Sequence, residues 1–260
     1  MPHAIVTGAS SGIGAALARE LSAHGWDLTL VARRRPLLDE LAAGLRTRCH
    51  VVEADLSDLD AATGWLPGAT AALGPVELLV NNAGVQVVAP TAGVDLARAE
   101  ASLRVNLLSP MRLWRAVLPD MLARGQGTVV DICSMAALAP TPGMAWYNAS
   151  KAGLAGASEA LRGELRGTGV HVVTVYPGII ASTAMAREGI AAYEPSWAVR
   201  LQPTGTEEEL ARRVRGAVER RRPRVIYPWI NHTARWFPGP TRWVMDTFTP
   251  PVRALPRDPG

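Results

Sequence analysis

Two side chains that could exchange protons with a substrate stand four residues apart, Tyr147 and Lys151. Positions i and i+4 share one face of a helix, so a phenol and an ammonium at these positions are neighbours. A phenol ionises near pH 10, and a cation within about 4–6 Å lowers that pKa by one to three units. The pair therefore predicts a general acid or base, and the alternative is an ordinary surface contact.

The scarcity of lysine favours the catalytic interpretation. Of the 27 basic residues, 26 are arginines, and Lys151 is the one lysine. Arginine does not replace a compact ammonium that must fit beside another group and tune it. Ser134 lies thirteen residues before Tyr147, at the carboxyl end of a predicted strand, which is the edge where open α/β sheets bind ligands. Its hydroxyl would hydrogen-bond the same carbonyl oxygen of a substrate as the phenol.

A glycine-rich turn follows the first predicted strand, with the sequence Thr7-Gly8-Ala9-Ser10-Ser11-Gly12-Ile13-Gly14. Glycines let the backbone turn tightly and approach a pyrophosphate, and the helix that follows offers unpaired N–H groups to that anion. The spacing differs from G-x-G-x-x-G, and a plain glycine-rich turn is the alternative. The strand before it and the helix after it favour a dinucleotide site.

Arginines end the second predicted strand, where an acidic residue would accept a hydrogen bond from a ribose 2′-hydroxyl. Arg33 and Arg34 instead suit a 2′-phosphate, and the alternative is a solvated basic start to a helix. Asp55 follows the third strand and is expected either at an adenine edge or as the N-cap of the next helix.

The elements that must position these residues alternate between short apolar strands and helical patterns. Strands without polar alternation are typical of a parallel sheet buried on both faces, so we expect a doubly wound Rossmann-type α/β sheet of about seven strands. The expected strands are 4–7, 28–32, 49–53, 78–81, 128–132, 170–175 and 224–227, and the expected helices are 12–24, 36–46, 59–73, 96–124, 147–167 and 207–221.

Composition excludes several classes of protein. The 260 residues are 48% hydrophobic and 19% charged, which is typical of a globular chain, and the net charge of +4 is too small to predict nucleic-acid binding. Two cysteines, Cys49 and Cys133, predict neither a disulfide framework nor a metal site. We expect no signal peptide and no membrane span, and a cytoplasmic location.

One catalytic domain is expected over residues 1–228, with a mobile substrate lid at about 184–205 that includes Tyr193 and Trp197. A Trp-, Pro- and Arg-rich extension covers 229–260. Its tryptophans recur every seven residues at Trp229, Trp236 and Trp243, although prolines interrupt any continuous helix. We expect these rings to pack against the core or a partner subunit rather than a membrane, and an aromatic wall over the substrate is the other possibility.

Five motifs at coherent spacing resemble the short-chain dehydrogenase/reductase family. They are Thr7–Gly14, Asn81-Asn82-Ala83-Gly84, Asn106, Ser134 and Tyr147–Lys151, with Pro177-Gly178 after the sixth strand. The resemblance runs from about residue 3 to residue 183 and returns in the last helix and strand. It implies a single Rossmann-type domain and hydride transfer between a nicotinamide and a carbinol carbon.

The resemblance also implies roles for individual residues. Tyr147 is the acid–base, Ser134 polarises the carbonyl, Lys151 lowers the pKa of the phenol and binds the nicotinamide ribose, and Asn106 holds a helix kink and a water. The expected cofactor contacts are Gly8, Ser10, Ser11, Gly12, Ile13, Gly14, Arg33, Arg34, Asp55, Leu56, Asn82, Ala83, Gly84, Tyr147, Lys151, Pro177, Gly178, Ile180, Ser182 and Thr183. The chain has Ser11 where NADPH-preferring members often carry a basic residue, so the preference for NADP(H) over NAD(H) rests on the two arginines.

The sequence therefore predicts an NADP(H)-dependent oxidoreductase that reduces a ketone or aldehyde, or catalyses the reverse reaction. The alternatives are imine reduction, epimerisation or dehydration on the same fold, and a non-catalytic NADP(H) sensor. The expected partners are a small hydrophobic carbonyl compound or alcohol and further copies of the chain, as a homodimer or homotetramer.

Overall fold

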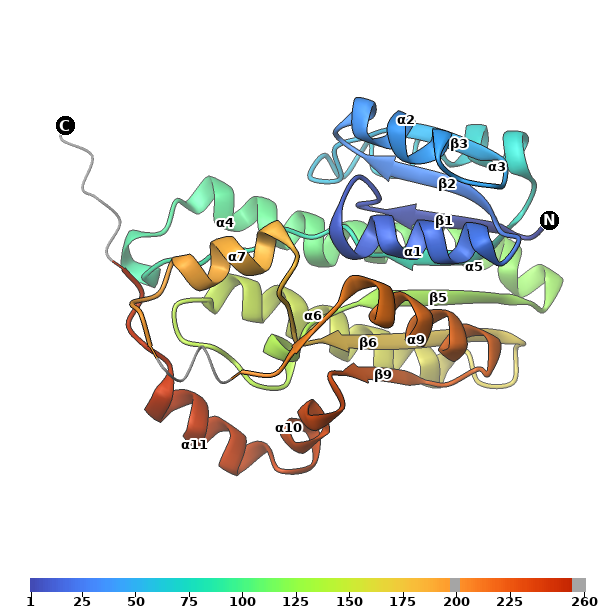
Figure 1. The fold of residues 1–260 in the computed structure, drawn as a ribbon. Coiled ribbons are helices and arrows are strands. Elements are labelled where there is room, and N and C mark those ends of the chain that lie inside the picture. The colour runs from blue at the N-terminus through green and yellow to red at the C-terminus, as the bar shows by residue number, and fades with distance from the viewer. Residues whose placement is uncertain (197–201, 254–260) are drawn as a thin grey trace.

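A parallel sheet of seven strands forms the centre of the protein in a computed structural model that describes residues 1–196 and 202–253 (Figure 1). The strand order is β3-β2-β1-β4-β5-β6-β9, and every neighbouring pair is parallel. The strands are β1 His3–Thr7, β2 Asp27–Ala32, β3 Cys49–Glu53, β4 Val76–Asn81, β5 Gly127–Ile132, β6 Val170–Pro177 and β9 Arg224–Tyr227. A small second sheet pairs β7 (Ile179–Ile180) with β8 (Thr204–Gly205). The expected doubly wound fold is confirmed.

Helices cover both faces of the sheet and enclose two apolar cores. The helices are α1 Gly12–Ala23, α2 Arg35–Ala43, α3 Leu66–Leu73, α4 Leu96–Leu103, α5 Ser109–Arg124, α6 Ala145–Glu164, α7 Ala184–Ala191, α9 Glu207–Glu219, α10 His232–Trp236 and α11 Pro238–Phe248. Leu17 of α1, Leu38 of α2 and Leu210 of α9 belong to one core, whereas Leu113 of α5 and Leu154 of α6 belong to the other. Because both faces are covered, apolar residues predominate in the strands, as the sequence predicts, although polar residues such as His3, Thr29 and Asp131 are buried there too.

Two helix predictions need correction. The helix expected from residue 59 begins only at Leu66, because Asp58 accepts hydrogen bonds from the backbone N–H groups of Asp60 and Ala61 and holds a turn, and Pro67 then suits the first helical turn. The helix expected over 96–124 contains a π-helical segment, Arg104–Leu108, between α4 and α5. Such segments frequently mark functional sites, and Asn106 lies at the centre of this one.

The segment after β6 also departs from expectation. Residues 184–205 were predicted to form a mobile loop, but α7 occupies the first eight of them, and Thr183 caps it by accepting a hydrogen bond from the Ala186 N–H at 3.1 Å. Trp197 lies outside the described residues. Within the described part of the chain, no helix is both long enough and apolar enough to cross a membrane.

Candidate active site

The glycine turn packs directly against the end of β4, which explains two of its glycines. Gly8 has φ +65°, and a Cβ there would lie 2.7 Å from the Ala83 Cα. A Cβ on Gly14 would lie 2.3 Å from the Gly8 carbonyl oxygen. The Asn82 Nδ2 donates to the Thr7 carbonyl at 2.9 Å and locks the turn to β4. The turn therefore brings bare backbone to the N-terminus of α1, as an anion site requires.

Arg34 lies over this turn. Its Nη2 donates to the hydroxyls of Ser10 and Ser11 at 2.9 and 2.8 Å. Arg33 lies 4.0 Å from the Asp55 carboxylate. The Asp55 carboxylate accepts hydrogen bonds from the Ser57 N–H and hydroxyl, and α3 begins eleven residues later, so the helix-cap interpretation of Asp55 is wrong. Burial raises the pKa of Asp55, but these bonds and Arg33 outweigh it and lower the pKa below its usual value.

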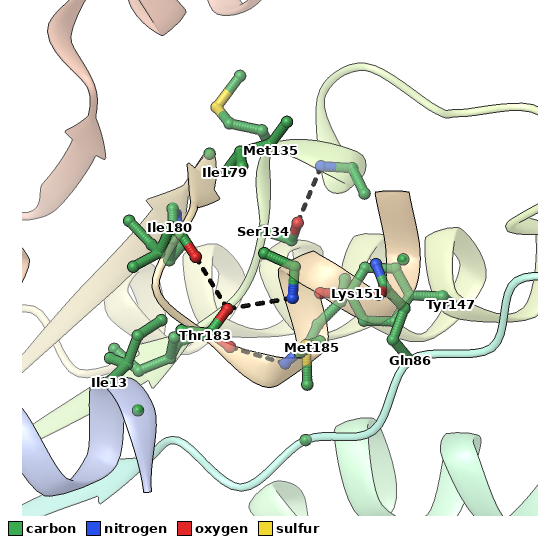
Figure 2. Close-up of a pocket in the computed structure, with 18 of the residues that line it drawn as sticks. Ile13, Gln86, Ser134, Met135, Tyr147, Lys151, Ile179, Ile180, Thr183 and Met185 are labelled. Atoms are coloured by element: carbon green, nitrogen blue, oxygen red, sulfur yellow. Dashed lines mark hydrogen bonds between the residues drawn. The ribbon is translucent and has the colours of Figure 1, made fainter. Parts of the chain in front are cut away.

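Tyr147 and Lys151 lie in the first two turns of α6, and Ser134 comes from the end of β5; Figure 2 shows all three in the same pocket. Both the phenol and the ammonium are almost completely buried. The Lys151 Nζ donates to the Ile132 carbonyl oxygen at 2.8 Å. The three residues that sequence spacing singled out are thus brought together at the carboxyl edge of the sheet.

The expected lowering of the Tyr147 pKa is wrong for this structure. Burial raises the pKa of Tyr147, interaction with the Ser134 hydroxyl opposes that rise, and the buried Cys133 adds to it. Burial also lowers the pKa of Lys151. The physical reason is desolvation, which disfavours the charged form of each group and which spacing along a helix does not reveal. The phenol is therefore held in its protonated form.

Asn106 connects two segments of the site through the hydrogen bonds of its side chain. Its Nδ2 donates to the Val85 carbonyl at 2.8 Å and to the Ser150 hydroxyl at 3.0 Å, and its Oδ1 accepts from the Val85 N–H at 2.8 Å. The absence of a side chain on Gly84 makes room for this arrangement, because a Cβ there would lie 3.3 Å from the Asn106 Oδ1 and 3.4 Å from the Lys151 Nζ. Asn106 thus fixes the loop after β4 against α6, as the π-helical segment suggests.

A cavity of about 810 Å³ joins the glycine turn to the buried Tyr147. Every residue predicted to contact cofactor or substrate lines it except Asn106, which lies behind its wall. Thr183 faces the turn, because a Cβ on Gly12 would lie 3.4 Å from the Thr183 Cγ2. Ser182 points elsewhere and donates a hydrogen bond to the Glu207 carboxylate. Of the two residues left open by the sequence, Thr183 is the one beside the glycine turn; its methyl group faces the turn, while its hydroxyl donates to the Ile180 carbonyl at 2.9 Å and caps α7.

Sequence reasoning missed the wall of the cavity opposite the glycine turn. Thr241, Val244, Met245 and Phe248 of α11 line this wall. Their spacing of i, i+3, i+4 and i+7 is the helical signal that would have found them. Prolines at 238 and 240 obscured that signal, but Pro238 begins α11, where proline is well tolerated.

The residues after α11 contact the segment that follows α7 and so hold this wall over the site. Val252 pairs with Tyr193 in an antiparallel bridge, and the Arg253 N–H donates to the Ala192 carbonyl at 2.9 Å. The Tyr193 hydroxyl in turn donates to the Pro142 carbonyl at 2.7 Å. Val252 and Tyr193 pack in one apolar cluster with Tyr147. Residues after 228 are therefore part of the site that residues 1–228 were expected to form, although the domain boundary itself stays a prediction.

The expected burial of the C-terminal tryptophans against the core is wrong. Trp229, Trp236 and Trp243 are all strongly exposed. The seven-residue spacing does not align them on one helix, because Phe237 interrupts the chain between α10 and α11.

A second buried acid lies beneath the site, and no motif singled it out. Asp131 on β5 is fully buried, and its Oδ1 accepts hydrogen bonds from the Asn81 Nδ2 at 2.8 Å and the Trp114 Nε1 at 3.0 Å. Burial raises the pKa of Asp131 to about 6, although hydrogen bonds to Asn81, Ser158 and Trp114 and the charge of Lys151 oppose the rise.

This carboxyl predicts a pH dependence of stability. Because the folded state raises the pKa of Asp131, its stabilising contribution is complete below about pH 4 and is lost as the pH rises through about 6. We expect the unfolding free energy of the wild type, relative to Asp131→Asn, to fall by about 2–3 kcal/mol between about pH 4 and pH 7. Urea unfolding of both proteins at each pH measures it, and a constant difference would show that Asp131 does not titrate in this range.

Comparison with known proteins agrees with this geometry. The sequence pattern that describes the short chain dehydrogenases matches residues 2–193. The chain belongs to the short-chain dehydrogenase family. A ketoacyl reductase of Nostoc is 34% identical over 191 residues, which are 70% of this chain and 64% of that protein. A sulfoacetaldehyde reductase of Chromohalobacter salexigens is 38% identical over 179 residues, 67% of this chain and 71% of that one. The chain thus matches just under two thirds of the length of the Nostoc relative.

Solved short-chain dehydrogenases share the whole architecture, including the C-terminal elements. A Sphingobium yanoikuyae short-chain dehydrogenase in complex with NADPH covers 99% of this chain and 100% of its own, with a TM-score of 0.80 and 29% identity. A Streptomyces avermitilis short-chain dehydrogenase covers 94% and 95%, with a TM-score of 0.80 and 28% identity. The α/β sheet with its C-terminal helices is therefore shared with other members of the family.

Proposed function

We propose that this short-chain dehydrogenase is an NADP(H)-dependent oxidoreductase that reduces a bulky apolar ketone or aldehyde to an alcohol. The observation that carries the proposal is the single cavity that joins the glycine turn, Arg34 and the buried group of Ser134, Tyr147 and Lys151. Two relatives, a fatty acyl-CoA reductase of Mycobacterium tuberculosis and the sulfoacetaldehyde reductase, are named for reductions.

The residues present fit a phosphorylated dinucleotide. Gly8 and Gly14 let the turn pack tightly on itself and against the end of β4, and α1 presents its N-terminus there. Arg34, supported by two serine hydroxyls, and Arg33 supply cationic donors suited to a 2′-phosphate. The bound nicotinamide supplies the hydride, and the chain supplies the proton and the orientation.

The chain's own acid–base chemistry favours reduction. Ser134 and Tyr147 present two hydroxyls to one region, where both can donate to a carbonyl oxygen. The Tyr147 phenol is protonated at neutral pH, so it carries the proton that the forming alkoxide takes. Lys151 lies one helical turn after Tyr147 on α6 and lines the same cavity, so its ammonium would stabilise the phenolate left by that transfer. Asn106 is a positioning residue that holds α6 and the loop after β4 in register.

The apolar part of the cavity lining, which includes residues of the α11 wall, indicates the substrate class. Met144, Tyr193, Val244, Met245 and Phe248 belong to it, so the cavity offers mainly apolar surface there. A relative of known structure is a Comamonas testosteroni alcohol dehydrogenase described as specific for bulky-bulky ketones; it is 25% identical, with a TM-score of 0.76. The specificity of that relative supports an apolar carbonyl substrate with large groups on both sides.

A carbonyl panel tests the proposal. Rates of NADPH and NADH oxidation would be measured with short polar aldehydes, long-chain aldehydes and diaryl ketones. We expect turnover with the bulky apolar members. NADPH binding without any turnover would favour the non-catalytic sensor, and turnover of imines alone would favour the other chemistry open to this fold.

Cofactor choice gives a prediction of its own. We expect Arg34→Ala to weaken NADPH binding by about 10–100-fold, because a charge-assisted hydrogen bond to a phosphate contributes about 1.5–3 kcal/mol, and to leave NADH binding unchanged. Fluorescence titration with both cofactors measures it. The matched control is Arg35→Ala, because Arg35 pairs with Asp39 on the exposed side of α2 and does not line the cavity. Equal losses for NADPH and NADH would contradict the role of Arg34.

A further inference from the structure

The C-terminal helices carry an aromatic surface that the proposed reaction does not use. We call Trp229, Ile230, Trp236, Phe237 and Trp243 the Trp surface; its four aromatic side chains are 73, 71, 61 and 62% exposed in chain order. At about 200 Å² per aromatic side chain, they expose about 500 Å². This much exposed aromatic area on neighbouring short helices is unusual for a monomeric protein and commonly marks a binding site.

The Trp surface lies on the short C-terminal helices, beyond the last strand of the sheet. In Figure 1, α11 lies at the lower left, away from the helices that cover the sheet, and α10 lies below β9, where its Arg235 pairs with Glu159 of α6 at 3.2 Å. No residue of α11 is buried, and Trp243 contacts only the edge of the Phe248 ring, with centroids 6.0 Å apart, among the described aromatic pairs. The exposure of these rings therefore does not come from one loose side chain.

We propose that the Trp surface docks the protein on a lipid bilayer, so that α11 lies between the lipid and the substrate cavity. Exposed tryptophan and phenylalanine beside arginine are typical of helices that lie in the membrane interface, where the indole N–H stays hydrated while its ring contacts acyl chains. With eleven and five residues, α11 and α10 are too short to span a bilayer, so they lie on it.

Charge supports a lipid occupant. The chain carries +4 at neutral pH, which favours anionic headgroups. Arg242 lies beside Trp243 and has no ion-pair partner within residues 1–196 and 202–253, so it is available to a phosphate. A second copy docked through a two-fold axis would instead bring two surfaces of the same charge together.

Other residues of α11 explain what docking would serve. Val244, Met245 and Phe248 line the apolar wall of the cavity, so the helix that meets the lipid also bounds the substrate pocket. An apolar carbonyl compound dissolved in a bilayer would reach the cavity without crossing water. This second step rests on the proposed function, whereas docking itself does not.

Vesicle binding tests docking independently of catalysis. The full-length protein would be sedimented with vesicles of phosphatidylcholine, with and without phosphatidylglycerol. We expect binding to both, stronger with the anionic lipid, and quenching of tryptophan fluorescence by brominated lipid. Trp229→Ser/Trp236→Ser should lower the bound fraction at least about tenfold. Neither residue lines the cavity, so turnover of a water-soluble aldehyde should stay at the wild-type level.

The matched control is Leu96→Ser, which removes a 61% exposed apolar side chain from α4. This variant should bind vesicles like the wild type. Failure of the wild type to bind either vesicle, or equal binding by all three proteins, overturns the proposal. Light scattering tests whether a second copy covers the Trp surface instead. If the wild type is a dimer, the double variant is a monomer and neither binds vesicles, the Trp surface is a dimer interface and the lipid proposal is wrong. Vesicle binding without turnover of any carbonyl would keep docking and reject the proposed function.

Discussion

Tyr147→Phe is expected to lower kcat for ketone reduction by about 10²–10⁴-fold and to change NADPH affinity by less than about twofold. The substitution removes only the hydroxyl, and the remaining ring keeps its packing against Met144 and Tyr193. Without that hydroxyl, the side chain proposed to protonate the alkoxide is lost. Steady-state rates and fluorescence titration with NADPH separate the effect on chemistry from the effect on binding.

Tyr193→Phe is the matched control, because it removes another phenol from the same cavity. Burial raises the pKa of Tyr193 to about 12, and its hydroxyl donates to the Pro142 carbonyl rather than toward Ser134. We expect it to cost less than about tenfold in kcat, because one neutral hydrogen bond contributes about 1 kcal/mol. Wild-type turnover by Tyr147→Phe would show that another group moves the proton.

Lys151→Arg is expected to lower kcat/KM at least about 100-fold while the protein stays folded, since small displacements in an active site have effects of that size. The guanidinium is larger and planar, and it cannot occupy the place of an ammonium that donates to the Ile132 carbonyl. The space beside it is narrow, because a Cβ on Gly84 would already lie 3.4 Å from the Lys151 Nζ. Initial rates, together with circular dichroism to confirm folding, measure the outcome.

Arg166→Lys is the matched control for Lys151→Arg, because Arg166 is exposed just beyond α6 and does not line the cavity. That variant should keep wild-type rates. If Lys151→Arg also keeps them, any buried cation suffices at this position, and the scarcity of lysine in this chain has no catalytic meaning.

The fold and the reactive residues could be predicted from local sequence patterns. Parallel strands buried on both faces need unbroken apolar runs, which is why their number and order of appearance could be predicted. Ser134, Tyr147, Lys151 and the glycine turn were predicted because each lies at a strand end or on a single helix turn. Their spacing along the chain therefore specifies their placement.

The pKa values of the buried groups and the cavity wall formed by α11 depend on contacts between segments that are far apart in the chain. The pKa of Tyr147 moves opposite to the prediction because burial in a cluster with Met144 and Tyr193 outweighs the interaction with the Ser134 hydroxyl. The Asp131 network joins β4, β5 and α5, so no local motif contains it.

The amino-acid sequence alone was sufficient for the family, the sheet and the acid–base pair, because periodicity and fixed spacing are local properties. The tertiary structure decided which groups are desolvated, that α11 and the bridge between Tyr193 and Val252 close the substrate side, and that the C-terminal tryptophans stay exposed. Those outcomes depend on how segments about 50 or more residues apart pack together, and packing at that distance leaves no regular pattern in the chain.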